Sequence, residues 1–337
     1  MKPQEWRVYF EDRGLDKRLI GAYLNYVERL SQKKLPIIFE LDHLSSLVGI
    51  KIEYLARMIA SSPNFYREFH IPKRRGGKRR ILAPYESILS CQRWILRNIL
   101  DKISVHPAAH GFHSKRSIKT NANEHITGSA LLKMDLRDFF PSIPKSWIIN
   151  VFKELGYADN VSYYLASLCC YNDSLAQGAA TSPILSNIVL RGLDSRLSKL
   201  AKKCSLRYSR YADDLTFSGE KIHPSLMRIV TNIVEDYGLE VNTQKTRLKL
   251  KSGARIVTGV SISNGQLSIP RELKRKIKNE VFFIKKFGLL SHLSNRKIKN
   301  PNYLHTLLGK ISFWIFIEPE DKFALEAKKY ISSIMKE

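Results

Sequence analysis

The stretch that decides the fold reads Leu206-Arg207-Tyr208-Ser209-Arg210-Tyr211-Ala212-Asp213-Asp214-Leu215-Thr216-Phe217-Ser218. The residues on either side of its centre indicate two strands. The strands would meet at Tyr211-Ala212-Asp213-Asp214, so that two carboxylates lie together at the turn. The stretch therefore predicts a β-hairpin that presents Asp213 and Asp214 at its tip.

A third carboxylate lies upstream, at the end of a segment that predicts a buried strand. Residues 130–135 are nearly all apolar up to Asp135, which precedes Asp213 by 78 positions (213 − 135). Helices are expected between them at 145–155, 161–171 and 183–202, and a helix at 223–237 and a strand at 247–249 follow the hairpin. With one of the three intervening helices counted as an insertion, the order β, α, α, β, β, α, β is typical of a split βαβ arrangement. This α+β fold would bring the three carboxylates side by side on one antiparallel sheet.

Carboxylates at neighbouring strand ends suit a pair of divalent cations. Magnesium prefers hard oxygen ligands in octahedral geometry, and two such ions can activate a 3′-hydroxyl and stabilise a leaving pyrophosphate. Phosphoryl transfer needs positioning and charge neutralisation rather than a nucleophilic side chain. The alternative is an ordinary solvated Asp-Asp turn, because Tyr211-Ala212-Asp213-Asp214 is a weak match when it is taken alone.

The charge balance points to a polyanionic partner. The 337 residues include 56 Lys and Arg against 31 Asp and Glu, which gives a formal net charge of +25. Such a surplus favours nucleic acid first and an anionic membrane surface second. The apolar runs fall short of the roughly 20 residues needed to cross a bilayer, and residues 1–12 lack the apolar core of a secretory signal. We therefore expect a cytoplasmic protein without a membrane partner.

Helical and basic segments flank the predicted sheet. Helices are expected at 15–31, 41–61, 85–103 and 117–126. Strands at 65–71 and 79–83 would form a hairpin, and six of the eight residues from Lys73 to Arg80 are cationic. A last hairpin is expected over 255–262 and 266–269, with its turn at Asn264-Gly265. From Pro270 the chain is predicted to be helical, with 15 Lys or Arg against 7 Asp or Glu in 68 residues.

Several motifs follow one another in the order found in reverse transcriptases. They are Arg79–Pro84, Met134-Asp135-Leu136 with Phe139-Phe140-Pro141-Ser142-Ile143, Gln177–Asn187, Tyr211-Ala212-Asp213-Asp214, Asn242 with Lys245-Thr246, and Gly259. The resemblance covers about residues 70–262. It implies a right-hand polymerase with an N-terminal helical region at 1–62, fingers at 63–128, a ferredoxin-like palm at 129–262 and a helical, basic, RNA-binding thumb at 263–337.

The resemblance also implies roles for single residues. Asp135, Asp213 and Asp214 match the catalytic metal ligands, with two Mg²⁺ ions expected and Mn²⁺ as a possible substitute. Adjacent strand residues point to opposite faces, so Asp213 and Asp214 can share the site only through the turn geometry. The implied nucleotide-binding residues are Arg79 at the triphosphate, Phe140 as an aromatic gate against a 2′-hydroxyl, Gln177 against the nucleotide and Lys245 at the pyrophosphate. An ordinary surface lysine remains the alternative for Lys245, and core packing describes Phe139 better than Phe140.

Two further motifs resemble those of bacterial retron reverse transcriptases. Asn121-Ala122-Asn123-Glu124-His125 fits the N-A-x-x-H pattern, and Val257-Thr258-Gly259 fits the V-T-G pattern. In that family both motifs belong to regions concerned with the cognate RNA, and the thumb recognises an RNA stem. The implied RNA-binding residues are Asn121, His125, Val257, Thr258, Gly259, Lys274, Arg275, Lys278, Lys285 and Lys286. A satisfied polar residue at a helix end is the alternative for His125, whereas the five basic residues are spaced to line one side of a helix along a phosphate backbone.

The retron resemblance implies a particular reaction and set of partners. Such an enzyme binds one structured noncoding RNA and uses deoxynucleotides to extend the 2′-hydroxyl of an internal guanosine, which leaves a branched RNA–DNA product. In antiphage defence the enzyme and its product usually restrain a toxic effector protein. Two alternatives remain: a relative of group II intron or CRISPR-associated reverse transcriptases that extends 3′-hydroxyl primers, and a ribonucleoprotein scaffold whose polymerase activity is incidental. A neighbouring noncoding RNA gene would exclude the first, and substitution of Asp213 and Asp214 would test the second.

Overall fold

The computed structural model describes residues 3–73, 76–250 and 253–336, so Arg74 and Arg75 of the predicted basic turn lie outside the described residues. The chain forms two compact units, and it passes between them several times. The first unit comprises Met1–Phe112, Leu136–Arg196 and Val234–Glu240. The second comprises His113–Asp135, Leu197–Ile233 and Val241–Glu337. Two helices, α10 (Arg191–Lys203) and α11 (Ser225–Asp236), each continue from one unit into the other.

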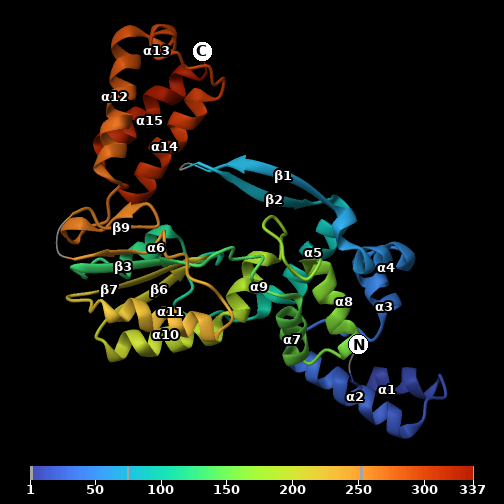
Figure 1. Ribbon diagram of the computed structural model, residues 1–337. Helices are drawn as coiled ribbons and strands as arrows, with labels where there is room; N and C mark the ends of the chain where they lie inside the picture. The colour runs from blue at the N-terminus through green and yellow to red at the C-terminus, as the bar shows by residue number, and fades with distance from the viewer. Residues whose placement is uncertain (1–2, 74–75, 251–252, 337) are drawn as a thin grey trace. The chain divides into compact units, whose positions relative to one another are not determined.

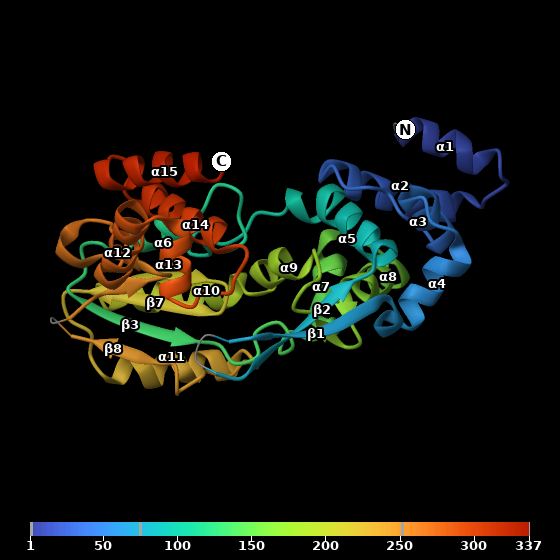
Figure 2. The same cartoon turned by 90° about the horizontal axis from the view of Figure 1, so that it is seen from above.

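A four-stranded antiparallel sheet organises the second unit. Its order is β6 (Arg207–Tyr211), β7 (Asp214–Gly219), β3 (Ala130–Asp135) and β8 (Arg247–Lys249), and Figure 2 shows β3 and β8 side by side. The predicted strands and their order along the chain are thereby confirmed. The apolar run of β3 forms a central strand because it is buried throughout most of its length. Figure 1 shows α6 (Ile118–Asn123) and α11 on opposite faces of this sheet.

Four helices complete the second unit at its C-terminal end. They are α12 (Arg271–Phe287), α13 (Leu289–Asn295), α14 (Tyr303–Ile317) and α15 (Lys322–Ile334). Their apolar faces enclose Trp314, whose side chain is fully buried, and the same core includes Ala122 of α6 and Leu131 of β3. The helices are therefore packed onto the sheet region through one continuous apolar core.

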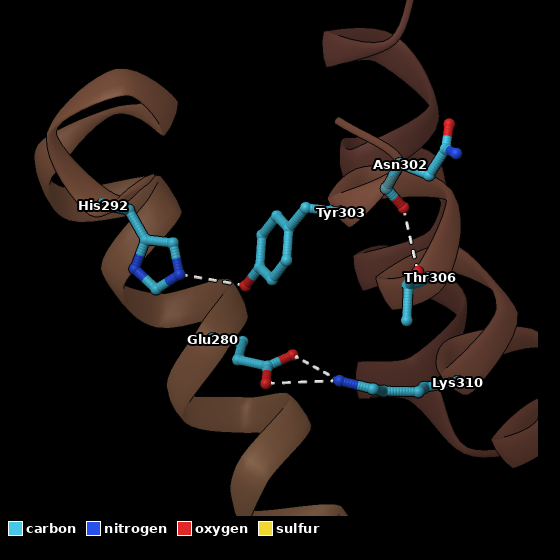
Figure 3. A network of polar contacts seen from close by, with 6 residues as sticks. All are labelled: Glu280, His292, Asn302, Tyr303, Thr306 and Lys310. Carbon is cyan, nitrogen blue, oxygen red and sulfur yellow. Dashed lines mark hydrogen bonds and ion pairs between the residues drawn. The ribbon is translucent and has the colours of Figure 1, made fainter. Parts of the chain in front are cut away.

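Polar contacts tie three of these helices together (Figure 3). The Nε2 atom of His292 lies 2.9 Å from the hydroxyl of Tyr303, and Nζ of Lys310 lies 3.2 Å from a carboxylate oxygen of Glu280. The hydroxyl of Thr306 donates to the carbonyl of Asn302 at 2.9 Å, within the first turn of α14. Burial lowers the pKa of His292, and the nearby charge of Arg296 lowers it further, so a neutral imidazole is favoured beside Tyr303.

The turn between the sheet and the helices differs from the prediction. We expected it at Asn264-Gly265, but β9 (Ile256–Val257) and β10 (Val260–Ser261) turn at Thr258-Gly259, where both residues have positive φ, 46° and 83°. A β-branched residue rarely adopts this conformation. Here the Thr258 hydroxyl donates to the carbonyl of Ile118 at 3.2 Å, a contact that lies 140 positions away in sequence. Asn264-Gly265 falls in a short 3-10 turn (Ser263–Gly265), although Ser261 and Ser268 do exchange backbone hydrogen bonds.

The first unit combines helices with a long hairpin. Strands β1 (Tyr66–Pro72) and β2 (Lys78–Pro84) pair along their whole length, as predicted, and form a two-stranded ribbon (Figures 1 and 2). Two short strands, β4 (Cys170–Tyr171) and β5 (Ser174–Leu175), also pair. The helices of this unit are α1 (Pro3–Glu11), α2 (Lys17–Gln32), α3 (Leu41–Val48), α4 (Ile52–Ala60), α5 (Glu86–Asn98), α7 (Lys145–Leu155), α8 (Asp159–Cys169) and α9 (Ser182–Val189).

Three helix predictions need correction. The helix expected over 41–61 is divided, because Gly49 ends α3 in a left-handed conformation with φ 71°. The helix expected over 183–202 is likewise divided, since α9 ends at Val189 and α10 begins at Arg191. Helix α1 was not predicted at all.

Within the described ranges, no helix is long and apolar enough to cross a membrane.

Candidate active site

The three predicted carboxylates all lie at one end of the antiparallel sheet of the second unit. Asp135, the last residue of β3, is the direct cross-strand partner of Asp214, the first residue of β7. Directly opposed residues point to the same face of a sheet, so these two side chains are neighbours. Between the strands β6 and β7 only Ala212 and Asp213 remain as the turn, and Ala212 has a positive φ of 56°. This tight turn places Asp213 next to the Asp135–Asp214 pair.

The electrostatics of the site confirm that these carboxylates interact. Burial raises the pKa of Asp213 most, the charges of Asp135 and Asp214 also raise it, and together these effects bring it to about 6. Burial also raises the pKa of Asp214, an effect that the nearby Lys133 opposes and the charge of Asp135 reinforces. Mutually repelling, partly desolvated carboxylates are a common feature of functional sites.

Lys245 supplies a positive charge to this cluster. Its Nζ lies 2.7 Å from Oδ1 of Asp135, although more than half of the lysine side chain is exposed. The turn that carries Lys245 is fixed to the same residue, because the backbone N–H of Asn242 donates to the carbonyl of Asp135 at 2.7 Å. Lys245 therefore belongs to the carboxylate site by position, as its motif predicted.

The carboxylates suit a divalent cation by their chemistry. They offer the hard oxygen ligands that magnesium prefers, and a shared cation would relieve the repulsion that raises the pKa of Asp213. Across the part of the chain that the structure describes, no three acidic, imidazole or thiolate side chains are already arranged as a metal-binding group. One oxygen of Asp135 is instead bonded to Lys245. The three carboxylates therefore lie together at the sheet end, and one of them is paired with a lysine.

The remaining predicted nucleotide-binding residues belong to the first unit. Arg79 is an exposed residue of β2, and Gln177, which is half-buried, lies just before α9. The carbonyl of Gln177 accepts a hydrogen bond from the N–H of Leu82 at 2.9 Å, so the two segments are in contact. Gly178 makes this approach possible, because a Cβ there would lie 2.4 Å from the carbonyl oxygen of Leu82. The structure thus brings Gln177 to the strand that carries Arg79.

Phe140, the predicted gate, is half-buried in an aromatic group of the first unit. Its ring centroid lies 5.2 Å from that of Phe139 and 6.1 Å from that of Phe112. Phe139 is almost fully buried, at 6% exposure, which agrees with a core role for that residue. Phe112 is partly exposed and has a positive φ of 59°. The Phe112 ring packs against one side of Phe140.

The predicted RNA-binding residues fall into two groups. Asn121, His125 and Val257 have no exposed surface, and the side chains of Asn121 and His125 are hydrogen-bonded within the protein. Thr258 is half-buried and bonded to Ile118, whereas Gly259 is exposed. Burial of the first three argues against the direct RNA contact that we expected of them. Their partners Ser209 and Ser218 were missed, although the two-residue repeat of a strand places both serines on the same face as Asp214.

The spacing of the basic residues of α12 suggested that they share one free surface, but their contacts differ. Lys274 is paired with Glu318, Lys278 lies over the rings of Trp314 and Phe323, and Lys285 lies over Tyr330. Arg275 instead lines a cavity of about 420 Å³ together with Lys276 and Arg296. Lys286 lies over the exposed rings of Phe282 and Phe287. The cations therefore flank the helix on two sides.

Comparison with known families identifies the family of this chain. Residues 71–282 match the family model described as reverse transcriptase (RNA-dependent DNA polymerase), which is more than half of the chain. The chain therefore belongs to the reverse transcriptase family and is an RNA-directed DNA polymerase with a right-hand fold.

Individual relatives narrow the family. The retron Ec86 reverse transcriptase of Escherichia coli is 36% identical over 78% of this chain and 83% of its own length. The retron Mx65 reverse transcriptase of Myxococcus xanthus is 35% identical over 74% of this chain but only 64% of its own length. Among solved structures, telomerase from Candida albicans with a fragment of telomeric RNA aligns at a TM-score of 0.43 and 13% identity, over 80% of this chain and 63% of that chain. By the sequence identities, the chain belongs among the retron reverse transcriptases.

Proposed function

We propose that this enzyme copies a structured noncoding RNA into single-stranded DNA that stays joined to the RNA through a 2′-hydroxyl branch. Support comes from the retron relatives together with the paired carboxylates Asp135 and Asp214 at the sheet end. In the first step the 2′-oxygen of a guanosine attacks the α-phosphorus of a deoxynucleoside triphosphate, and pyrophosphate leaves. Later additions use the 3′-hydroxyl of the growing DNA in the same way.

We assign the catalytic roles on the motifs, supported by the contact between Lys245 and Asp135. Asp135, Asp213 and Asp214 would hold two Mg²⁺ ions, or Mn²⁺ in their place, and the bound ions would neutralise charge on the reacting phosphates. Lys245, which lies at Asp135, would bind the leaving pyrophosphate. Arg79 would bind the triphosphate, since a guanidinium suits phosphate oxygens. Phe140 and Gln177 would contact the sugar and base of the incoming nucleotide.

The domain roles follow the boundaries expected from the sequence. We assign the fingers to residues 63–128, the palm to 129–262 and the thumb to 263–337, behind an N-terminal helical region at 1–62. In the thumb, the exposed cations Arg275 and Lys276 at the cavity and Lys286 beside the exposed phenylalanines are the best candidates for contact with an RNA backbone. Lys274 is the weakest candidate, because its charge is already paired with Glu318.

Antiphage defence is the biological setting that we propose. The RNA–DNA product and the enzyme together would restrain a toxic effector protein in the cytoplasm, where RNA and deoxynucleotides are available. The exposed helices of the N-terminal region offer a surface for such a partner, although helix α4 also packs against α8 within the first unit.

A purification experiment tests this function. The wild-type protein and the Asp213→Asn/Asp214→Asn variant are isolated from cells with their nucleic acid, which is then digested separately with RNase and DNase. We expect one discrete DNA, joined to RNA by a linkage that survives denaturation and is released by a 2′,5′-specific debranching enzyme, in the wild type alone. Heterogeneous RNA without attached DNA would contradict the proposal. DNA joined through a 3′-hydroxyl would favour an intron-like or CRISPR-associated mode of priming.

A further inference from the structure

The side chains of the N-A-x-x-H motif are among the most completely buried polar groups of the second unit. Asn121 and His125 have 0% exposure, as do their partners Ser209 and Ser218. Buried polar groups of this kind are normally hydrogen-bonded, and a fully satisfied network specifies one local geometry. The motif therefore makes its contacts inside the protein, and the residues that it contacts indicate its role.

Five hydrogen bonds form one continuous chain through the motif, from Ser218 to the carbonyl of Ile118. The Thr258 hydroxyl donates to the carbonyl of Ile118 at 3.2 Å, so it can accept from Nδ2 of Asn121 at 3.4 Å. Oδ1 of Asn121 then accepts from the Ser209 hydroxyl at 2.6 Å. Because that proton is used, Ser209 accepts from Nε2–H of His125 at 2.7 Å. Nδ1 of His125 is left to accept from the Ser218 hydroxyl at 2.7 Å. The network is satisfied by a neutral imidazole protonated on Nε2.

His125 bridges the two strands that carry the catalytic turn. Ser209 lies on β6 four residues before Asp213 (213 − 209), and Ser218 lies on β7 four residues after Asp214 (218 − 214). Along β7, Asp214 and Ser218 share a face because they are separated by an even number of positions. One imidazole therefore holds both arms of the hairpin at equal sequence distance from the carboxylates.

Close packing fixes the segment that follows His125. A Cβ on Gly128 would lie 2.8 Å from Cβ of Ser218 and 2.9 Å from the backbone nitrogen of Gly219. The next residue, Ser129, donates its hydroxyl to the carbonyl of Glu220 at 2.8 Å. On the other side of the motif, Ala122 joins the apolar core shared with Val257 and the C-terminal helices. The motif is thus a rigid connection between the catalytic hairpin and the base of those helices.

We propose that Asn121, His125 and Thr258 are positioning residues of the polymerase, which hold the β6–β7 hairpin in its catalytic geometry and do not touch nucleic acid. The inference rests on the proposed polymerase activity but not on the retron product. Small displacements of catalytic groups reduce rates strongly, by about 100-fold for roughly 1 Å. The network should therefore control the rate of nucleotide addition rather than the affinity for RNA.

Primer extension and RNA binding separate the two roles. Extension is measured with an oligo(dT) primer on poly(rA), which needs no cognate RNA, and binding is measured with the RNA that copurifies with the wild-type protein. The variants are His125→Leu, which makes no hydrogen bond, His125→Gln, which retains one donor and one acceptor group, and Ser209→Ala and Ser218→Ala. Ile331→Val, in the buried core of α15, serves as the control for a general loss of stability.

We expect kcat for extension to fall about 10- to 100-fold in His125→Leu and less in His125→Gln and the serine variants. RNA affinity should stay within about twofold of wild type, since no RNA contact is lost. Weaker RNA binding with unchanged extension would overturn the proposal in favour of direct contact. A second result would also overturn it: kcat for extension falls equally in His125→Gln and His125→Leu, and it falls by as much in Ile331→Val when the melting temperatures are equal. The loss would then come from lower overall stability. Failure of the wild type to extend any primer would instead refute the polymerase function itself.

Discussion

Nζ of Lys245 donates a hydrogen bond to Oδ1 of Asp135 at 2.7 Å, so a cation of the protein is already bound to one of the three proposed metal ligands. Lys245 and a divalent ion at the proposed site would therefore compete for the same carboxylate. The lysine side chain is more than half exposed, whereas that of Asp135 is 11% exposed. Solvent weakens such a pair, so Lys245 can leave Asp135 at a modest energetic cost.

Substitution of Lys245 should have opposite effects on metal binding and on catalysis. In Lys245→Gln we expect Mn²⁺ to bind about two- to fivefold more tightly, because a competing positive charge has been removed. The rate of nucleotide addition should fall by about 100-fold if the lysine assists the leaving pyrophosphate. Electron paramagnetic resonance of free Mn²⁺ measures the first effect, and primer extension measures the second. Lys245→Arg keeps the charge and is the control; an unchanged metal affinity in Lys245→Gln would contradict the shared role of Asp135.

Removal of the charge of Asp213 should stabilise the metal-free protein. Its pKa is raised from 3.8 to about 6, chiefly by burial, so the folded state holds its proton more tightly than the unfolded state. Stability is therefore lost as the pH rises from about 4 to 6, and the full cost is present above pH 6. In EDTA at neutral pH, Asp213→Asn should raise the free energy of unfolding on the order of 1 kcal/mol, after allowance for solvent screening.

The stability gain has a clear control and pH signature. Asp101→Asn removes the same charge from an exposed position, and its effect should be close to zero. Below about pH 4 the difference between Asp213→Asn and wild type should vanish, because Asp213 is then protonated in both states. Denaturant unfolding at several pH values measures this. A variant that is less stable than wild type at neutral pH would show that the carboxylate is not under electrostatic stress.

The catalytic sheet was predictable from sequence because its signals are local. The strand-forming residues of 206–218 and the apolar run before Asp135 set the strands β6, β7 and β3, and their order along the chain brought Asp135 beside Asp214. The turn at Thr258-Gly259 was not predictable in this way. Thr258 has a positive φ, and its hydroxyl is hydrogen-bonded to Ile118 and Asn121, which lie 140 and 137 positions away in the sequence.

The buried network was hidden for a similar reason. His125 and the serines Ser209 and Ser218 are 84 and 93 positions apart in sequence, and serine on a half-buried strand carries no special signal. The motif alone suggested RNA contact, whereas the side chains of Asn121 and His125 are buried and hydrogen-bonded within the protein. Among the basic residues of α12, the spacing does not reveal that Lys274 is paired with Glu318.

A smaller side chain at position 140 should weaken discrimination against ribonucleotides. Phe140→Val shortens the side chain that we place beneath the incoming sugar, and we expect the preference for dNTP over rNTP to fall about tenfold or more. Phe112→Ala should produce a smaller loss in the same direction, because the Phe112 ring lies 6.1 Å from that of Phe140. The ratio of kcat/KM for the two substrates is the measurement. Phe152→Leu, at a fully buried position of α7, is the control and should leave this ratio unchanged.

Two glycine-to-alanine substitutions should change stability in opposite directions. A Cβ at Gly128 would meet Ser218 and Gly219 at under 3 Å, so Gly128→Ala should cost about 1–3 kcal/mol. Gly309 lies within α14 with no other atom within 4 Å of a new Cβ, and Gly309→Ala should stabilise by about 0.5–1 kcal/mol. Thermal unfolding of the two variants compares them directly. Stabilisation by Gly128→Ala would mean that the loop after His125 does not pack on β7 as described.

Glu280 and Lys310 should stabilise the C-terminal helices only when both charges are present (Figure 3). Their side chains are 15% and 26% exposed, so either charge would be poorly solvated without its partner. Lys310→Met alone should cost about 1–3 kcal/mol, and Glu280→Gln combined with it should recover much of the loss. Arg7→Met is the matched control, because Arg7 and Glu11 are more than half exposed and 4.0 Å apart, which predicts a cost below about 1 kcal/mol. A double-mutant cycle in urea measures the coupling; equal costs for Lys310→Met and Arg7→Met would show that burial adds nothing to the Glu280–Lys310 pair.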